Sequence, residues 1–259
     1  MDISDTQINA WIAQYFWPFC RVGAFFLALP LIGTRSIPMN VRLLFAVGIT
    51  VLVAPLTGKM PHVALMSLDS YIIVFQQLII GLALGFVVQL LFQFFVVGGQ
   101  FIAMQNGLGF SSMIDPTNGL SVAAVSQIYL MMVNLIFFAL NGHLALIRFI
   151  VESFRHLPVS DTGISPDALF FIAKSGSWMF ENAVLLALPA VIALLVVNLA
   201  FGVMSRVAPQ MNIMSVGFPL NMVAGVLILW ISLSSVLPLY ERTFDETMDS
   251  LLEVIAPNG

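Results

Sequence analysis

Long stretches without any charged side chain constrain this chain more than any other feature. No Asp, Glu, Lys or Arg occurs in the 45 residues between Asp69 and Asp115, the 24 between Glu181 and Arg206, or the 34 between Arg206 and Glu241. A helix needs about 20 consecutive apolar residues to cross a bilayer, so each stretch can supply at least one membrane helix. Only 8% of all residues are charged, against roughly 25% in soluble domains. We therefore expect an all-α chain that is embedded in a membrane or derived from one.

The sequence lacks the patterns of several functional classes. No basic cluster is present to neutralise the phosphates of a nucleic acid. The single Cys20 excludes an intrachain disulfide, and the three histidines have no carboxylates at the spacing of metal ligands. Neither a G-x-S-x-G motif nor a complete dinucleotide fingerprint occurs. We expect no enzyme activity, no cofactor, no metal and no nucleic-acid partner.

The first apolar segment, Ile8 to Ile32, has the character of a membrane helix but contains Arg21. An arginine at membrane depth costs roughly 2.5 to 3.5 kcal/mol on insertion scales. We therefore expect Arg21 to face protein. A second helix is expected from Val41 to Leu56, which is short for a full span.

The uncharged stretch after Asp69 is expected to form one long helix to about Phe95, an interruption at Gly98 and Gly99, and a second apolar stretch to Met104. Gly81 and Gly85 are spaced as G-x-x-x-G, a pattern that lets two membrane helices approach closely. The alternative is that these glycines are incidental. The glutamines of this stretch would be costly facing lipid, so we expect much of the helix to lie against protein. They are Gln76, Gln77, Gln89, Gln93, Gln100 and Gln105.

The segment Gly107 to Gly119, with the sequence GLGFSSMIDPTNG, breaks the helical pattern between two apolar stretches. Irregular backbone at membrane depth is tolerated only where protein buries it or where it lines a water-filled path. We interpret this segment as a loop in a pore. Its candidate pore residues are Gly107, Gly109, Phe110, Met113, Ile114, Asp115, Pro116 and Gly119.

Two alternatives stay open within the loop. Asp115 is either a pore-lining carboxylate or the cap of a turn before Pro116. Phe110, Met113 and Ile114 either close a wet channel by excluding water or anchor the loop on its own helices. The glycines Gly107, Gly109 and Gly119 are expected to act as hinges.

The second half of the chain predicts further helices. An apolar helix from Val122 to Leu140 is expected to bend at Asn141 to His143 into an amphipathic helix that ends near Leu157. The polar connector from Pro158 to Asp167 is the best domain boundary, which divides the chain into 1–166 and 167–259. The second part is predicted to be a helical hairpin. Residues assigned to its turn and to assembly are Arg206, Pro209, Gln210 and Asn212.

The chain is expected to end in an amphipathic helix. Its apolar face is predicted from the i, i+4, i+7, i+8, i+11 spacing of Phe244, Met248, Leu251, Leu252 and Ile255, with acidic residues opposite. Anionic lipid would repel that acidic face, so we expect it to meet protein.

Several motifs together carry a family resemblance. They include YFWPFCR at 15–21, QQLIIGLALGF at 76–86, QNGLGF with DP at 105–116, NGHLALI at 141–147, FRHLP at 154–158 and NLAFGVMSRVAPQMNI at 198–213. In these motifs, their order and their spacing, the chain resembles the flagellar FliR branch of the FliR/SctT family of type III secretion export-gate proteins.

This resemblance implies a gating subunit that assembles with FliP and FliQ in the bacterial inner membrane, at the flagellar basal body. FlhB and FlhA would lie beneath the gate, and unfolded flagellar subunits would pass through it. The resemblance also implies that 1–166 is FliP-like, that 167–259 is FliQ-like, and that the loop from Gly107 to Gly119 is a plug. The alternatives are an injectisome gate subunit of the same family and an ion-coupled secondary transporter, although the long spans hold almost none of the buried ionisable groups that a carrier needs.

Overall fold

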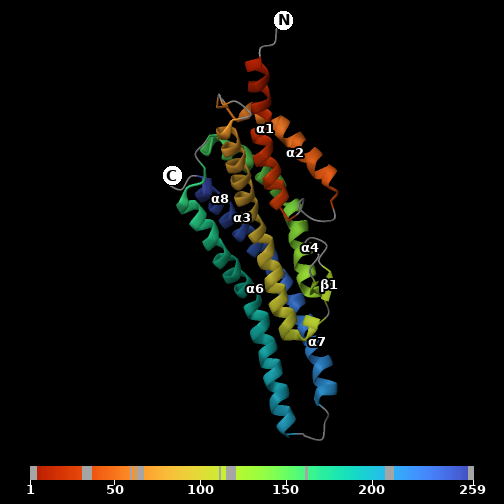
Figure 1. The fold of residues 1–259 in the computed structure, drawn as a ribbon. Helices are drawn as coiled ribbons and strands as arrows, with labels where there is room; N and C mark the ends of the chain where they lie inside the picture. The colour runs from red at the N-terminus through yellow and green to blue at the C-terminus, as the bar shows by residue number, and fades with distance from the viewer. Residues whose placement is uncertain are drawn as a thin grey trace. The chain divides into compact units, whose positions relative to one another are not determined.

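The structure is a computed structural model of the chain, and it describes residues 5–30, 37–58, 60–61, 63, 67–110, 112–114, 121–160, 163–207 and 213–255. Within these residues the expectation of an all-α chain is confirmed, apart from two three-residue strands (Figure 1). The α-helices are α1 (Asp5–Ala28), α2 (Met39–Val53), α3 (Leu68–Asn106), α4 (Ala124–Ala139), α5 (Gly142–His156), α6 (Pro166–Val207), α7 (Ile213–Ser232) and α8 (Val236–Ile255). Short 3-10 turns are η1 (Ala54–Leu56), η2 (Leu108–Phe110) and η3 (Leu233–Ser235), and the strands are β1 (Ser112–Ile114) and β2 (Ser121–Ala123).

The two longest helices begin at serine caps. The Ser67 hydroxyl accepts a hydrogen bond from the backbone N–H of Ser70 at 3.3 Å before α3. Ser165 does the same for Ala168 at 3.2 Å before α6, where Pro166 occupies the first helical position. Such caps satisfy N–H groups that the helix itself leaves unpaired, and proline suits a position whose N–H has no partner in the helix. Both starts are therefore fixed by local sequence.

Four helices within the described residues are long and apolar enough to cross a membrane, or five spans if the bent pair α4 and α5 forms one. The chain turns by 70° between α4 and α5. Asn141 makes this turn with a left-handed backbone, at φ 57°. The bend expected at Asn141 to His143 is confirmed.

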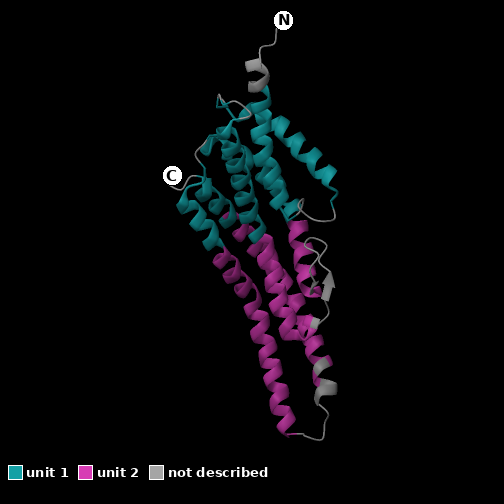
Figure 2. Ribbon diagram, viewed as in Figure 1, with its two compact units in different colours: residues 1–90, 137–175, 246–259 teal, residues 91–136, 176–245 magenta. Residues whose placement is uncertain are grey.

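The fold separates into two compact units (Figure 2). Unit 1 contains residues 1–90, 137–175 and 246–259, and unit 2 contains residues 91–136 and 176–245. The sequence places a boundary at 166/167 from the polar connector, and the family resemblance implies a FliP-like part before it and a FliQ-like part after it. That division stays a prediction.

In unit 1, α3 packs closely on α1 at Gly81 and Gly85. A Cβ atom on Gly81 would collide with the backbone carbonyl of Arg21. A Cβ atom on Gly85 would lie 2.5 Å from the Cβ of Ala28 and 2.8 Å from the carbonyl oxygen of Phe25. These contacts leave no room for any side chain larger than hydrogen at either position.

Arg21 is the polar centre of unit 1, and its expected orientation toward protein is confirmed. It is 0% exposed, and its guanidinium donates to Gln77 Oε1 at 2.8 Å, to the Ser153 carbonyl at 3.0 Å and to the Leu157 carbonyl at 2.7 Å. The Ser153 hydroxyl lies 3.3 Å away, and the Phe154 ring centroid is 4.1 Å from the guanidinium carbon. Arg21 thus joins α1, α3 and α5 without a carboxylate.

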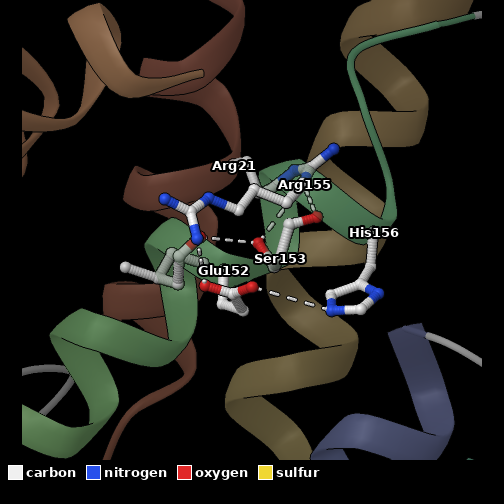
Figure 3. Close-up of polar contacts among 6 residues, drawn as sticks. Arg21, Glu152, Ser153, Arg155 and His156 are labelled. Atoms are coloured by element: carbon white, nitrogen blue, oxygen red, sulfur yellow. Dashed lines mark hydrogen bonds and ion pairs between the residues drawn. The ribbon is translucent and has the colours of Figure 1, made fainter. Parts of the chain in front are cut away.

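The carbonyls that Arg21 binds lie at the C-terminal end of α5, at Ser153 in its last turn and at Leu157 just after it. The Ser153 carbonyl also accepts the backbone N–H of Leu157, and the partial negative charge of a helix C-terminus attracts a cation. The nearby carboxylate of Glu152 is instead directed toward the partly exposed face of α5, where it lies 3.3 Å from Arg155 and 3.8 Å from His156 (Figure 3). The amphipathic character predicted for this helix is confirmed, and Ser153 adds a polar contact on its buried face.

In unit 2, one sequence expectation was wrong. Helix α3 is continuous from Leu68 to Asn106 and has no interruption at Gly98 and Gly99. Both glycines serve close packing: a Cβ on Gly98 would lie 2.7 Å from Leu186 Cδ2, and one on Gly99 would lie 2.7 Å from Ser126 Cα. Because neighbouring helices enclose this part of α3, packing outweighs the poor helix propensity of glycine.

The apolar face predicted for α8 also differs from the buried one. Leu251 and Ile255 are buried, but Leu252 is 43% exposed, and Tyr240, Thr243 and Thr247 are buried instead. The Thr243 hydroxyl donates to the carbonyl of Leu239 at 2.8 Å. A threonine whose hydroxyl is satisfied within its own helix can be buried, so hydrophobicity alone found Leu251 and Ile255 but missed the polar members of the buried face.

Candidate functional site

The candidate site begins where α3 ends, at Asn106 and Gly107. Gly107 has a φ of 81°, a left-handed conformation that favours glycine, and it turns the chain out of the helix into η2. Gly109 follows within η2, and a Cβ there would lie 3.3 Å from Met104 Cα. The two glycines therefore differ. Gly107 is required by its backbone conformation, whereas Gly109 has little room for a side chain because the last turn of α3 lies close to it.

A short antiparallel hairpin follows. Ser112 pairs with Ala123, Met113 with Val122, and Ile114 with Ser121. The irregular loop that we expected is thus partly regular, because β1 within it pairs with β2, which follows it and occupies the start of the helix expected from Val122. Phe110 lies in η2, and Met113 and Ile114 lie in β1. Asp115, Pro116 and Gly119 lie outside the described residues.

The second strand of the hairpin, β2, which we call the returning arm, is hydrogen-bonded to α3 through Gln100. Its Oε1 accepts a hydrogen bond from the backbone N–H of Ala123 at 3.0 Å, and the Ser126 hydroxyl lies 3.4 Å away. The same turn of α3 carries Gly99, against which the backbone of Ser126 packs. A single side chain therefore holds both the end of β2 and the start of α4.

The segment that leads from α3 into β1, which we call the outgoing arm, starts at Asn106, a buried residue whose amide is unpaired within the described part of the chain. Asn106 is 0% exposed, and neither its amide nitrogen nor its amide oxygen has a hydrogen-bond partner among the described residues. The amide rests against Gly225 of α7, where a Cβ atom would collide with the Asn106 Nδ2 atom. Buried amides in proteins are nearly always paired, so Asn106 differs from Gln100, whose amide oxygen has two donors within hydrogen-bond distance.

The residues assigned to the turn of the C-terminal hairpin are placed only in part. Arg206 lies exposed in the last turn of α6. Pro209, Gln210 and Asn212 lie outside the described residues. No three His, Cys, Asp or Glu side chains in the described part of the chain are grouped so that they could hold a metal ion.

Sequence reasoning missed part of this site. Gln100 stood out only as one of six glutamines expected to avoid lipid, and Ser126, Asn106 and Gly225 were not singled out. The available signal was position: Gln100 and Asn106, like Gln105 beside it, are polar residues in the last two turns of the helix before the loop. Their different roles follow from contacts with α4 and α7, which no local pattern reveals.

Residues 12–247 match the family described as Bacterial export proteins, family 1. The chain belongs to this family. The resemblance to the FliR branch is confirmed by relatives along nearly the whole chain.

Three of these relatives show how widely the similarity extends. The flagellar biosynthetic protein FliR of Escherichia coli K12 is 34% identical over 99% of this chain and 98% of its own length. The protein of the same name from Bacillus subtilis 168 is 29% identical over 93% of this chain and 94% of its own. That from Caulobacter vibrioides is 31% identical over 89% and 92%.

Proposed function

We propose that this chain is a structural and gating subunit of the flagellar type III protein export channel, and that its hairpin is the plug. The observation that carries the proposal is a glycine-turned hairpin between two apolar helices in a member of a bacterial export family. Non-helical backbone among membrane helices is tolerated where protein encloses it or where it lines a water-filled path. A protein-conducting pore provides that path.

The assembly that we propose contains FliP and FliQ, with FlhB and FlhA beneath it, in the bacterial inner membrane at the flagellar basal body. The exposed apolar surface of this chain supports assembly with other membrane chains. Only 22% of the most apolar window of α6 and 17% of that in the α7 and α8 region are buried within the chain. The flagellar name of the relatives favours this channel over the injectisome gate.

The proposed mechanism involves no bond chemistry. Apolar side chains of the hairpin, together with neighbouring chains, exclude water from the closed channel, and an arriving export substrate displaces them. Phe110, Met113 and Ile114 are the residues we assign to closure, and Gly107, Gly109 and Gly119 those we assign to movement. For Asp115 we propose the role of a pore-lining carboxylate.

The proposal is tested by replacing residues 109–117 with nine Gly and Ser residues, which keeps the length of the loop and removes its apolar side chains. We expect ion leakage across the inner membrane to rise while co-purification with FliP and FliQ is retained. The control is a Gly/Ser replacement of equal design in the connector 59–66, which should leave leakage unchanged. A tight membrane combined with normal flagellar export in the loop variant would refute the plug.

A further inference from the structure

We propose that a groove at the start of α3 binds one acyl chain of a phospholipid whose headgroup carries an ammonium group, such as phosphatidylethanolamine. The groove is formed by residues 68–79 of α3, residues 163 and 164 of the connector and the start of α6, and all of these belong to unit 1 (Figure 2). A lipid at this groove requires only that the chain lies in a membrane, and it does not depend on the hairpin being a plug.

The groove is lined mainly by apolar side chains. They are Leu68, Ile72, Phe75 and Ile79 of α3, together with Ile164 and Leu169. Phe75 is 64% exposed, so the chain itself leaves this surface uncovered. Contiguous apolar surface of this kind is typical of a site for a lipid or for another apolar partner.

The connector that lines the groove packs against α3 and is fixed where it begins. A Cβ atom on Gly163 would lie 3.4 Å from the Cδ of Gln76, so the backbone of the connector lies directly against that glutamine. At the end of α5, Arg21 binds both Gln77 Oε1 and the carbonyl of Leu157. The groove therefore lies between elements whose packing is defined on both sides.

The dimensions of the groove fit one extended hydrocarbon chain. From Leu68 to Ile79 the helix rises about 16 Å, at 1.5 Å per residue. One leaflet of the hydrocarbon core of a bilayer is about 15 Å thick. The groove has a volume of about 640 Å³, so its average cross-section is about 40 Å², half that of a helix about 10 Å in diameter. An acyl chain can thus fill the groove along its length, whereas a whole helix does not fit within it.

Two carboxylates mark the headgroup end of the groove. Asp69 and Asp167 lie in the first turns of α3 and α6, close in sequence to the lining residues Leu68 and Leu169. Both are exposed, and neither forms an ion pair with another residue in the described part of the chain. Tyr71, which also lines the groove, is 62% exposed and offers an aromatic ring to a cation.

These groups select between headgroups. Carboxylates attract the ammonium group of a zwitterionic lipid and repel the net negative charge of phosphatidylglycerol. Tyrosine is also enriched at the headgroup level of membranes, where its ring is apolar and its hydroxyl is hydrated. The charge at this end of the groove therefore favours phosphatidylethanolamine over an anionic lipid.

The experiment uses the full chain co-expressed with FliP and FliQ and reconstituted in vesicles of equal parts phosphatidylethanolamine and phosphatidylglycerol. Traces of either lipid with the same diazirine-bearing acyl chain are added, and cross-linking to the peptide that contains residues 68–79 is measured by mass spectrometry. We expect the ethanolamine probe to label this peptide about fivefold more than the glycerol probe, since two partly exposed charge contacts give an effect of this order.

The combined substitutions Asp69→Asn and Asp167→Asn remove both charges with little change in shape, so the two probes should then label equally. Asp249→Asn changes another exposed acid of unit 1, in α8, and as the matched control it should leave the preference unchanged. Ile164→Trp fills the groove and should lower labelling by both probes severalfold. Because the preference is a ratio between two probes, a smaller amount of folded protein does not change it.

Three outcomes would overturn the lipid site. Equal labelling of the unmodified chain by the two probes would remove the headgroup selection. Absence of labelling by either probe in the complex would mean that a partner protein covers the groove. Labelling that Ile164→Trp leaves unchanged would place the lipid elsewhere on α3. If the double variant does not co-purify with FliP and FliQ, Asp167→Asn alone should lower the preference, and an unchanged preference counts against the site.

These results are independent of the plug test, because none of the substitutions lies in the hairpin. Leakage from the loop replacement without a headgroup preference would leave the proposed function standing and remove the lipid site. A headgroup preference without leakage would support the lipid site and remove the plug.

Discussion

Helices α3 and α6 are alike in sequence and opposite in environment. Both are long, at 39 and 42 residues, and both contain long uncharged runs. Yet 67% of the most apolar window of α3 is buried within the chain, against 22% for α6. Hydrophobicity therefore identifies a membrane helix but does not say whether that helix faces its own chain, a partner or lipid.

The surroundings of the glycines in α3 and α6 differ in the same way as the burial of the two helices. A Cβ atom would collide with neighbouring atoms at Gly81, Gly85, Gly98 and Gly99 of α3. At Gly176 and Gly202 of α6, a Cβ atom would meet no atom of the described residues within 4 Å beyond the adjoining turns of its own helix. Small residues let the backbones of membrane helices approach where lipid gives no hydrophobic drive for association. In α3 the glycines let other helices of the same chain approach closely. In α6 the glycines make no such contact within the described part of the chain and are available for contact with a partner.

The largest expected effect is that of Gly81→Val in α3. The new side chain would meet the backbone of Arg21, which cannot move without shifting α1. Overpacking of this kind costs roughly 1 to 3 kcal/mol, and more where the obstacle is backbone. We expect a large fall in the thermal unfolding midpoint of the detergent-solubilised chain. Gly202→Val is the control in α6, and equal losses in both variants would contradict the comparison.

An intermediate effect is expected for Gln77→Leu, which takes the acceptor away from the Nε of the buried Arg21. A hydrogen bond to a charged group contributes roughly 1.5 to 3 kcal/mol. The unfolding midpoint should fall by a corresponding amount, whereas Asn198→Leu in α6 should change it little. A neutral result for Gln77→Leu would mean that the carbonyls of Ser153 and Leu157 suffice to hold the guanidinium.

The smallest effect is expected for Gly202→Ala, and its sign is reversed. Alanine is favoured over glycine in helix interiors by roughly 0.5 to 1 kcal/mol, and the site has open space. The isolated chain should become slightly more stable. The same variant is also informative in the complex, because weaker co-purification with FliP and FliQ would show that a partner packs on α6 at this glycine. Lower stability of the isolated chain would contradict the open environment.

Much of the fold was predictable because its signals are local. The absence of charge located the membrane helices, and the cost of burying an arginine placed Arg21 against protein. The glycine-rich segment after Asn106 ended α3 where the sequence said it should. Errors arose where a local rule met a non-local contact: Gly98 and Gly99 were expected to break a helix that neighbouring helices hold together.

The candidate site shows the same limit more sharply. The sequence located the segment from Gly107 to Gly119, but it could not distinguish the two arms of the hairpin. That distinction rests on Gln100, whose partners are 23 and 26 residues away, and on Asn106, whose neighbour Gly225 lies in another helix.

The sequence by itself determined that this chain is helical, suited to a membrane, and interrupted by one glycine-rich segment, because the transfer of apolar residues from water and the backbone preference of glycine act residue by residue. The motifs of the sequence likewise indicated the family to which the chain belongs. Only the tertiary structure decided which long helix is enclosed, which face of α8 is buried, and where Arg21 finds its acceptors. These choices depend on the close approach of segments up to 136 residues apart, and packing and hydrogen-bond pairing exist only once those segments meet.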